Sequence, residues 1–295
     1  MADLLSSSAP QGRLRRLMDS GQGPVLLPGC YDALGARLVE QAGFDGVYMT
    51  GFGTAASLLG RPDVGLLGLA EMVDNARRIV DAVAVPVVAD ADTGYGNPIN
   101  AIHTVRSFER AGVAAIHLED QVTPKRCGHM EDKEVVPVAE FAAKIRAAVD
   151  ARDSEDFLII ARTDARAPMG LDEARRRADA AVEAGADVLF IEALRNREEI
   201  ETIAAEYGNT PLLHNWVEGG KSPSLTYSEL AELEFALVIM PITVLLAAVG
   251  AVRSVLAAVK ADGSPVNVEG TIPAFADFTE LIGLAEINQL EHRYV

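Results

Sequence analysis

The segment Lys125-Arg126-Cys127-Gly128-His129 surrounds one cysteine with three basic side chains. Neighbouring positive charge stabilises a thiolate, so such a cysteine can serve as a nucleophile or as a general acid. A lone cysteine can also be a small buried residue without a chemical role. No second Cys or His stands at the spacing of a zinc site, which argues against zinc. We predict a catalytic role for Cys127, with Lys125 and His129 as its basic partners.

Carboxylates directly follow two short apolar runs. Val-Val-Ala-Asp-Ala-Asp ends in Asp90 and Asp92, and Ile-His-Leu-Glu contributes Glu119. Carboxylates that meet at one place repel one another unless they are protonated or neutralised. A hard divalent cation neutralises them, and ligands that are all oxygen favour Mg²⁺ or Mn²⁺ over zinc. The pattern predicts a magnesium site at these three residues, and a set of helix caps and salt bridges with Arg162 is the alternative.

Eight apolar runs that would position these residues alternate with amphipathic helical stretches. The expected strands are residues 25–29, 46–50, 85–90, 114–119, 157–162, 188–192, 211–215 and 236–240. Runs of this kind are typical of parallel strands that are covered on both faces. Three of the intervening helices end in an Ala-Gly pair, at Gly43, Gly112 and Gly185, where glycine can form a left-handed cap. Eight strand–helix units predict a closed (β/α)8 TIM barrel of the α/β class, with an open doubly wound sheet as the alternative.

In such a barrel, the side chains at the carboxyl ends of the strands meet at one mouth. Five consecutive expected strands end in or beside polar residues, namely Asp90, Glu119, Arg162, Glu192 and Asn215. These side chains should therefore converge. Residues 121–137 form a long connection after the fourth strand, and long loops inside compact barrels are commonly lids or binding loops.

Two glycine-containing segments could hold an anion near this mouth. Tyr48-Met49-Thr50-Gly51-Phe52-Gly53 offers a phenol, a hydroxyl and backbone N–H groups, and residues 215–223 read Asn-Trp-Val-Glu-Gly-Gly-Lys-Ser-Pro. Glycine lets backbone amides approach an anion closely. On spacing alone, an ordinary glycine turn explains the second segment better and the first segment about as well.

Composition excludes several classes of partner. The 295-residue chain has a net charge of −17, so it should repel phosphate backbones and anionic lipid, and we expect neither nucleic acid nor a membrane as a partner. Two cysteines cannot build a disulfide framework, and residues 1–22 lack the apolar core of a signal peptide. We expect a cytoplasmic protein with a single domain over residues 1–295. Residues 1–22 would be an N-terminal extension, and residues 271–295 would form one further helix outside the eightfold pattern.

Residues 235–252 carry no charge and are long enough to span a membrane. Pro241 and Gly250 interrupt this run, and its first part is rich in strand formers, so we interpret it as a buried strand followed by a helix. That helix is apolar nearly all round and must be covered on several sides. A partner subunit is the simplest cover.

Together these segments resemble the isocitrate lyase / phosphoenolpyruvate mutase superfamily. The matching motifs are Tyr48-Met49-Thr50-Gly51, Asp90-Ala91-Asp92-Thr93-Gly94-Tyr95-Gly96, His117-Leu118-Glu119-Asp120-Gln121, Lys125-Arg126-Cys127-Gly128-His129, Ala161-Arg162-Thr163-Asp164-Ala165, and Asn215 with Glu218-Gly219-Gly220-Lys221-Ser222-Pro223. They run in order from about Pro28 to the C-terminus, and the Lys-Arg-Cys-Gly-His motif is highly specific.

The resemblance implies a barrel whose eighth helix is swapped onto a neighbouring subunit, in dimers that pair as a homotetramer. It implies Mg²⁺ held by Asp90, with Asp92 and Glu119 acting largely through water. The catalytic set would be Cys127, Tyr48, Lys125, His129 and Arg162, and Arg162 would also help to hold the substrate carboxylate. The other substrate contacts would be Thr50, Gly51, Phe52, Gly128, Glu192, Asn215, Ser222 and Pro223.

The implied activity is cleavage of a carbon–carbon bond. The substrate would be a 2-hydroxy di- or tricarboxylic acid, of the alkylmalate or 2-methylisocitrate type, and the products a 2-oxo acid such as pyruvate and a carboxylate such as succinate. Lyases of this superfamily use the cysteine to protonate the departing carbanion, and Tyr48 is a candidate for the base. The alternatives are a carboxyphosphonoenolpyruvate-type phosphonomutase, which the chain resembles at residues 31–34, an oxaloacetate hydrolase or decarboxylase, and a non-enzymatic binding module.

Overall fold

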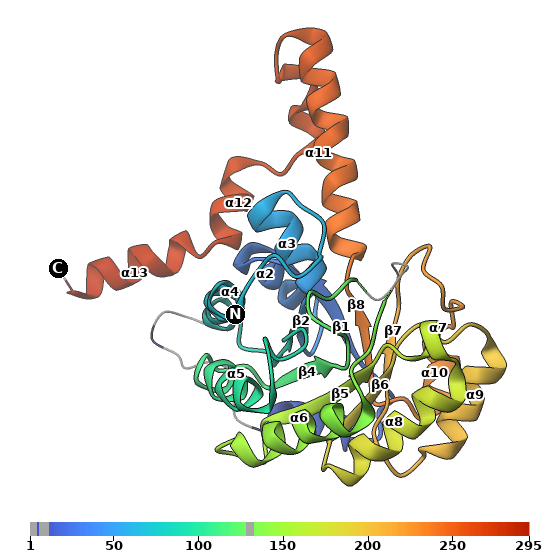
Figure 1. Ribbon diagram of the computed structural model, residues 1–295. Coiled ribbons are helices and arrows are strands. Elements are labelled where there is room, and N and C mark those ends of the chain that lie inside the picture. The colour runs from blue at the N-terminus through green and yellow to red at the C-terminus, as the bar shows by residue number, and fades with distance from the viewer. Residues whose placement is uncertain (1–4, 6–11, 128–132, 295) are drawn as a thin grey trace.

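Eight parallel strands form the centre of the computed structural model, which describes residue 5 and residues 12–127 and 133–294 (Figure 1). The strands are β1 (Val25–Cys30), β2 (Val47–Met49), β3 (Val87–Asp90), β4 (Ala115–Glu119), β5 (Leu158–Thr163), β6 (Val188–Ile191), β7 (Leu213–Asn215) and β8 (Leu237–Met240). They pair in the order β6-β5-β4-β3-β2-β1-β8-β7, and a parallel bridge between Leu189 and Leu212 joins the two ends. The predicted barrel is confirmed, and the open sheet is excluded.

Helices α2 to α10 surround this barrel, and the helices from α11 onward lead away from it (Figure 1). The helices are α1 (Arg13–Met18), α2 (Ala33–Gln41), α3 (Gly51–Leu59), α4 (Leu69–Ala82), α5 (Pro98–Arg110), α6 (Val138–Ala151), α7 (Arg166–Met169), α8 (Leu171–Glu183), α9 (Arg197–Glu206), α10 (Tyr227–Glu232), α11 (Thr243–Asp262), the 3-10 helix η1 (Val266–Thr271), α12 (Phe275–Leu281) and α13 (Leu284–Tyr294). The glycines of the three Ala-Gly pairs have positive φ angles of 88°, 85° and 93°, as their capping role requires.

Alternate strand residues face the barrel interior, where they form an apolar core. The inward residues are Val25, Leu27, Tyr48, Val88, Ala115, Leu158, Ile160, Val188, Phe190, Leu213, Leu237 and Ile239. Leu14 of α1 joins this cluster with 1% of its surface exposed, so part of the expected N-terminal extension is packed into the barrel. Cys30 belongs instead to the cluster between strands and helices, where burial raises its thiol pKa.

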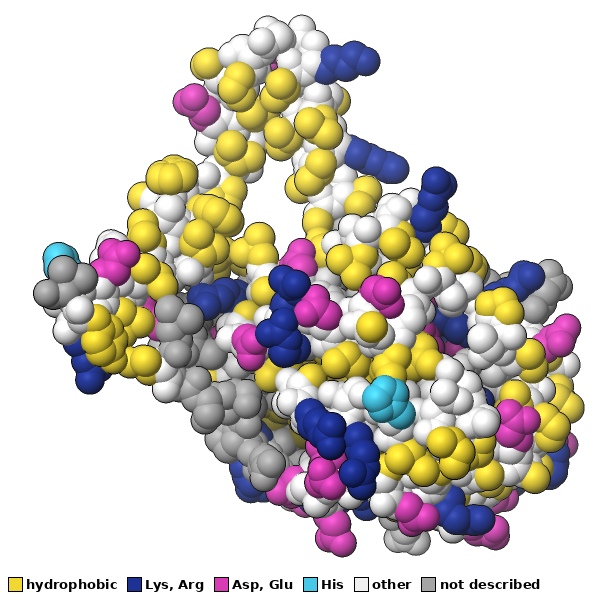
Figure 2. All heavy atoms as spheres, turned by 60° about the vertical axis from the view of Figure 1, so that its left-hand side comes forward, with side chains coloured by type: hydrophobic (Ala, Val, Ile, Leu, Met, Phe, Trp, Pro, Cys, Tyr) yellow, Lys and Arg dark blue, Asp and Glu magenta, His cyan; other side chains and the backbone are white. Residues whose placement is uncertain are grey.

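An arm projects from the barrel after β8. None of the 20 residues of α11 is buried, and Leu246, Val252 and Leu256 are each about half exposed. Figure 1 shows the chain turning back through η1 and α12, and Figure 2 shows hydrophobic side chains along this arm. By length and composition, α11 is the one helix in the described part of the chain that could cross a membrane.

The C-terminal tail differs from the single helix expected over residues 271–295. It contains two helices, α12 and α13, separated at Gly283. Gly283 has a φ angle of +85°, which lies outside the right-handed helical region and ends the first helix. A lone glycine inside a helical pattern does not by itself indicate such a break.

A buried ion pair connects α8 to the segment after β4. Arg177 Nη1 lies 3.0 Å from Asp120 Oδ2, and neither side chain is more than 3% exposed. Asp120 also accepts hydrogen bonds from the Thr163 hydroxyl at 2.6 Å and from the Asp164 backbone N–H at 2.8 Å. This carboxylate therefore joins a helix to the carboxyl end of β5.

Replacing Arg177 by Met should destabilise the protein by about 3–5 kcal/mol, because the substitution leaves the Asp120 carboxylate buried without its cation. Arg176→Met is the matched control. Arg176 and Arg177 both donate hydrogen bonds to Glu173. The Arg176 side chain is 58% exposed, so replacing it should cost less than about 1 kcal/mol. The measurement is urea unfolding of both variants. Equal losses of unfolding free energy in the two variants would show that the buried Arg177–Asp120 pair contributes no more to stability than the exposed pair does.

Candidate active site

A cavity of about 270 Å³ opens at the carboxyl ends of the strands. Nine residues expected from the sequence line it: Tyr48, Thr50, Phe52, Asp90, Lys125, Cys127, Arg162, Glu192 and Asn215. Gly51, Asp92 and Glu119 lie directly behind this lining, whereas Ser222 and Pro223 follow in the loop after β7 and do not line the cavity. Gly128 and His129 lie outside the described residues.

The carboxylates at the mouth are neutralised by two buried cations. Lys125 Nζ lies 2.7 Å from Asp92 Oδ1 and 2.6 Å from Asp63 Oδ2, and Arg162 Nε lies 3.3 Å from Glu119 Oε2. Burial raises the pKa of Asp92 to about 6, even with Lys125 beside it. Burial also raises the pKa of Glu119 well above its usual value, against the opposing charge of Arg162. These two cations thus lie among four buried carboxylates, those of Asp63, Asp90, Asp92 and Glu119.

Asp90 behaves differently from its neighbours. Burial opposes its ionisation, but its pKa is lowered overall by His117, Lys125 and Arg162, and by the hydrogen bond that its Oδ1 accepts from the Asp92 backbone N–H at 2.9 Å. A Cβ atom at Gly51 would overlap Asp90 Oδ2. The glycine therefore leaves space for an ionised carboxylate that points into the mouth.

These residues fit a hydrated cation. Within the described ranges, no three carboxylate, histidine or cysteine side chains are close enough to surround a metal ion directly. The oxygen donors include the ionised Asp90 and the buried Glu119 Oε1, which has no hydrogen-bond partner among the residues that the structure describes. Mg²⁺ commonly keeps several waters and takes only one or two protein carboxylates. One direct ligand at Asp90, with Asp92 and Glu119 reached through water, would suit this arrangement.

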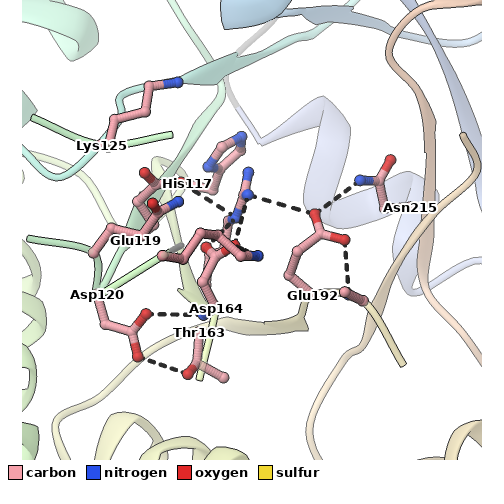
Figure 3. A network of polar contacts seen from close by, with 12 residues as sticks. His117, Glu119, Asp120, Lys125, Thr163, Asp164, Glu192 and Asn215 are labelled. Atoms are coloured by element: carbon pink, nitrogen blue, oxygen red, sulfur yellow. Dashed lines mark hydrogen bonds and ion pairs between the residues drawn. The ribbon is translucent and has the colours of Figure 1, made fainter. Parts of the chain in front are cut away.

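Arg162 is held in place by a neighbouring carboxylate. Its Nε and Nη2 donate to the two oxygens of Asp164 at 2.9 and 3.1 Å, and its guanidinium lies over the Phe190 ring at 5.0 Å. Its Nη2 is also 3.5 Å from Glu192 Oε2, which accepts a hydrogen bond from Asn215 Nδ2 at 2.9 Å. Figure 3 shows Glu192 turned toward Asn215. The guanidinium is thus oriented before any substrate binds.

Helix α3 begins at the cavity wall. The hydroxyl oxygen of Thr50 caps it by accepting a hydrogen bond from the Gly53 N–H at 3.2 Å. The first N–H groups of a helix have no carbonyl partner within the helix, and they attract anions. The amides of Gly51 and Phe52 occupy these positions. Together with Arg162 they offer the cavity donors for a carboxylate.

The loop that carries Cys127 rises from a paired stem. Val122 N–H donates to Glu134 O, and Val136 N–H donates to Asp120 O, both at 2.8 Å. The amide group of Gln121 makes two hydrogen bonds with the backbone of Arg126, at 2.8 and 3.0 Å. The backbone next to Cys127 is therefore fixed by a side chain from the stem.

Several cavity residues were not predicted from the sequence. Asp63 comes from the loop after α3, and an apolar wall is formed by Val217, Ile239, Pro241 and Ile242. His117 lies just below the mouth, 2.7 Å from the Tyr48 hydroxyl. The sequence did contain a signal for His117. It stands two residues before Glu119 on the same strand, so it faces inward as Glu119 does. Asp63 carried no local signal, because its partner Lys125 is 62 residues away.

Comparison with known proteins agrees with this geometry. The family model described as Phosphoenolpyruvate phosphomutase matches residues 14–260. The chain is 47% identical to 2,3-dimethylmalate lyase of Eubacterium barkeri, over 96% of this chain and 97% of that protein. It is 43% identical to the chloroplastic carboxyvinyl-carboxyphosphonate phosphorylmutase of Arabidopsis thaliana, over 96% of this chain and 84% of that protein.

Solved structures give the same result. A crystal structure of 2,3-dimethylmalate lyase superimposes with a TM-score of 0.92 at 39% identity, covering 98% of this chain and 96% of that one. Oxaloacetate acetylhydrolase with 3,3-difluorooxalacetate also has a TM-score of 0.92, at 38% identity and 98% coverage of both chains. Phosphonopyruvate hydrolase with oxalate and Mg²⁺ has a TM-score of 0.87 at 36% identity, covering 97% of this chain and 99% of that one. The chain therefore belongs to the phosphoenolpyruvate phosphomutase family, within the PEP mutase/isocitrate lyase superfamily.

Proposed function

We propose that this protein is a magnesium-dependent carbon–carbon lyase that cleaves an alkyl-substituted 2-hydroxy dicarboxylate to a 2-oxo acid and a second carboxylate. The observation that carries the proposal is the composition of the cavity. The lining combines carboxylates, Arg162 and Cys127 with an apolar wall of Val217, Ile239, Pro241 and Ile242. The 47% identity to a 2,3-dimethylmalate lyase over nearly the whole chain supports it.

The apolar wall favours an alkylmalate over a tricarboxylate such as 2-methylisocitrate. Phe52, Val217 and Ile239 can cover alkyl groups, as can the neighbouring Pro241 and Ile242. The lining described here includes only two cationic side chains, Lys125 and Arg162, and both already face carboxylates. A third substrate carboxylate buried against this wall would lack a counter-charge, which is costly.

Each polar group then has a role. The carboxylate next to the hydroxyl-bearing carbon binds the amides of Gly51 and Phe52 and the guanidinium of Arg162. Bound Mg²⁺ would supply positive charge to the hydroxyl and carboxylate oxygens of the substrate. Tyr48, acting as the phenolate, would take the hydroxyl proton while the C2–C3 bond breaks and C2 becomes a carbonyl carbon. Cys127 delivers a proton to C3 of the departing fragment.

A phosphonomutase is the second candidate, because the Arabidopsis phosphorylmutase is 43% identical over most of its length. A mutase transfers a phosphoryl group and does not need a proton from Cys127 in that step. An oxaloacetate hydrolase is the third candidate, because the structure of oxaloacetate acetylhydrolase is similar to this one, so oxaloacetate should also be assayed. Pyruvate release from a panel of alkylmalates and 2-methylisocitrate tests the proposal directly, and oxalate release from oxaloacetate tests the hydrolase alternative.

We further propose a soluble, cytoplasmic homotetramer in which α11 packs against a neighbouring subunit. The exposed apolar side chains of α11, α12 and α13 supply the contact surface, and Arg253 and Lys260 within α11 disfavour a lipid environment.

The assembly prediction concerns α11. The double variant Leu246→Asp/Leu256→Asp should shift the tetramer to smaller species, because it places charge on an apolar contact surface. Ile99→Asp is the control: Ile99 is 71% exposed but lies on α5, so its replacement should leave the assembly unchanged. Light scattering at micromolar concentration measures both. A wild-type monomer would contradict the proposal.

The metal prediction concerns Gly51. Gly51→Ala should weaken Mg²⁺ binding by about tenfold or more, because the added methyl group displaces the Asp90 carboxylate, and disturbed ligand positioning has effects of this size. Gly208→Ala, whose Cβ would meet no atom closer than 3.7 Å, is the control. Calorimetry with Mg²⁺ measures the affinity. Unchanged affinity in Gly51→Ala would remove Asp90 as a ligand.

The proton-donor prediction concerns Cys127. Cys127→Ser should lower kcat for alkylmalate cleavage by about a hundredfold or more, because a serine hydroxyl is a much weaker acid than a thiol. Cys30→Ser is the control: Cys30 is fully buried outside the cavity, so its replacement should lower the melting temperature and spare kcat in the folded protein. Kinetics and melting curves on the same samples separate the two effects. A well-folded Cys127→Ser variant with near-normal cleavage would eliminate the acid role.

A further inference from the structure

His117 is a buried polar residue of the barrel interior, in register with Asp90 on β3 and Ile160 on β5. It lies on β4, two residues before Glu119, and none of its surface is exposed. The inward neighbours at this depth include Ile160 and Phe190. The imidazole lies directly beneath the cavity, on the side where Tyr48 and Asp90 face inward.

The imidazole is fixed by its surroundings. Its Nε2 lies 2.7 Å from the Tyr48 hydroxyl oxygen and 3.6 Å from Asp90 Oδ1. The Tyr48 ring stacks on it at 5.8 Å with an interplanar angle of 22°, and the Phe190 ring meets it edge-on at 5.7 Å and 90°. Two aromatic contacts on different sides leave the imidazole no freedom to turn away from Tyr48.

Packing alone does not account for a histidine here. Its Nδ1 is buried and has no hydrogen-bond partner among the described residues. An unpartnered buried nitrogen is unfavourable, and an apolar side chain of similar shape would avoid that cost. Local violations of this kind concentrate at functional sites. The hydrogen bond with Tyr48 and the 3.6 Å approach to Asp90 Oδ1 are contacts that a polar residue makes at this position and an apolar residue cannot make.

We propose that His117 is a positioning residue that holds the Tyr48 hydroxyl oxygen where it accepts the hydrogen of the substrate hydroxyl. The inference rests on the lyase function proposed above. A tyrosine ring without this contact can shift by a fraction of an ångström, and small displacements of this kind reduce rates substantially. When Nε2 carries the hydrogen, it donates to the Tyr48 oxygen, which as the phenolate keeps lone pairs for the substrate proton. The position of that oxygen, rather than the charge of the imidazole, is what His117 supplies.

Three variants of His117 test the role. Gln places an amide where Nε2 lies, Asn places it where Nδ1 lies, and Phe removes hydrogen bonding while keeping a planar ring. With 2,3-dimethylmalate and Mg²⁺, we expect kcat to fall at least tenfold in His117→Phe and His117→Asn and to stay within about threefold in His117→Gln. KM should change less than threefold in all three, because substrate binding depends on other groups.

A second measurement reports on Tyr48 without catalysis. In protein carrying ¹³Cζ-labelled tyrosine, the signal that disappears in Tyr48→Phe identifies Tyr48. Its chemical shift should move in His117→Phe and His117→Asn and return toward the wild-type value in His117→Gln. His214 supplies the control, since it is also buried and also has an unpartnered ring nitrogen, but it packs against Phe235 away from the cavity. His214→Phe should leave both kcat and the Tyr48 signal unchanged.

The outcomes are distinguishable. Equal loss of kcat in all three variants, in proportion to lost melting temperature, would assign His117 a purely structural role and overturn the proposal. An unmoved Tyr48 signal in His117→Phe would overturn it as well. If wild-type protein cleaves no alkylmalate, the lyase function fails, and the inference that depends on it fails with it. A Tyr48 signal that still follows the Phe, Asn and Gln series would then show that the contact exists without that reaction.

Discussion

Neutralisation of buried carboxylates is the constraint on which the mouth of this barrel depends. Asp63, Asp90, Asp92 and Glu119 are all buried at the mouth, with Lys125 and Arg162 as the neighbouring cations. Burial raises the pKa of Asp92 and of Glu119 in spite of these cations. One further cation would stabilise the ionised carboxylates. The proposed magnesium site and the stability of the mouth therefore both depend on neutralising these buried carboxylates.

Arg162 can offset the charge of the buried carboxylates because Asp164 fixes its guanidinium in place. Burial opposes ionisation of Asp164, yet its pKa is lowered, chiefly by Arg162 and Lys133. Lys133 Nζ lies 2.7 Å from the same carboxylate, and the Asp164 backbone donates to Asp120, which pairs with Arg177 on α8. Figure 3 shows Asp120 turned toward Thr163 and Asp164. Ion pairs and a hydrogen bond thus join an outer helix, a barrel strand and the segment that follows the Cys127 loop.

The apolar part of the cavity lining depends on closure of the barrel. Ile239 and Pro241 come from the end of β8, which pairs with β1. A Cβ atom at Gly29 on β1 would lie 2.5 Å from Pro241 O, so glycine at this position lets the two strand ends approach. The apolar wall and the polar residues of the mouth line the same cavity. The chain then leaves the barrel as α11, whose apolar side chains are exposed.

Local pattern was sufficient for the barrel and for the residues at its strand ends. Alternation of strand residues and the Ala-Gly caps are properties of neighbouring positions, so the eight strands and the inward-facing Asp90, Glu119 and Arg162 could be predicted without knowing any long-range contact. The tertiary structure decided which of these side chains meet. Lys125 reaches Asp63 across 62 residues, and Tyr48 reaches His117 across 69 residues. Contacts of this kind depend on barrel closure and on the register between strands, and neither quantity is encoded in the spacing of residues within one segment.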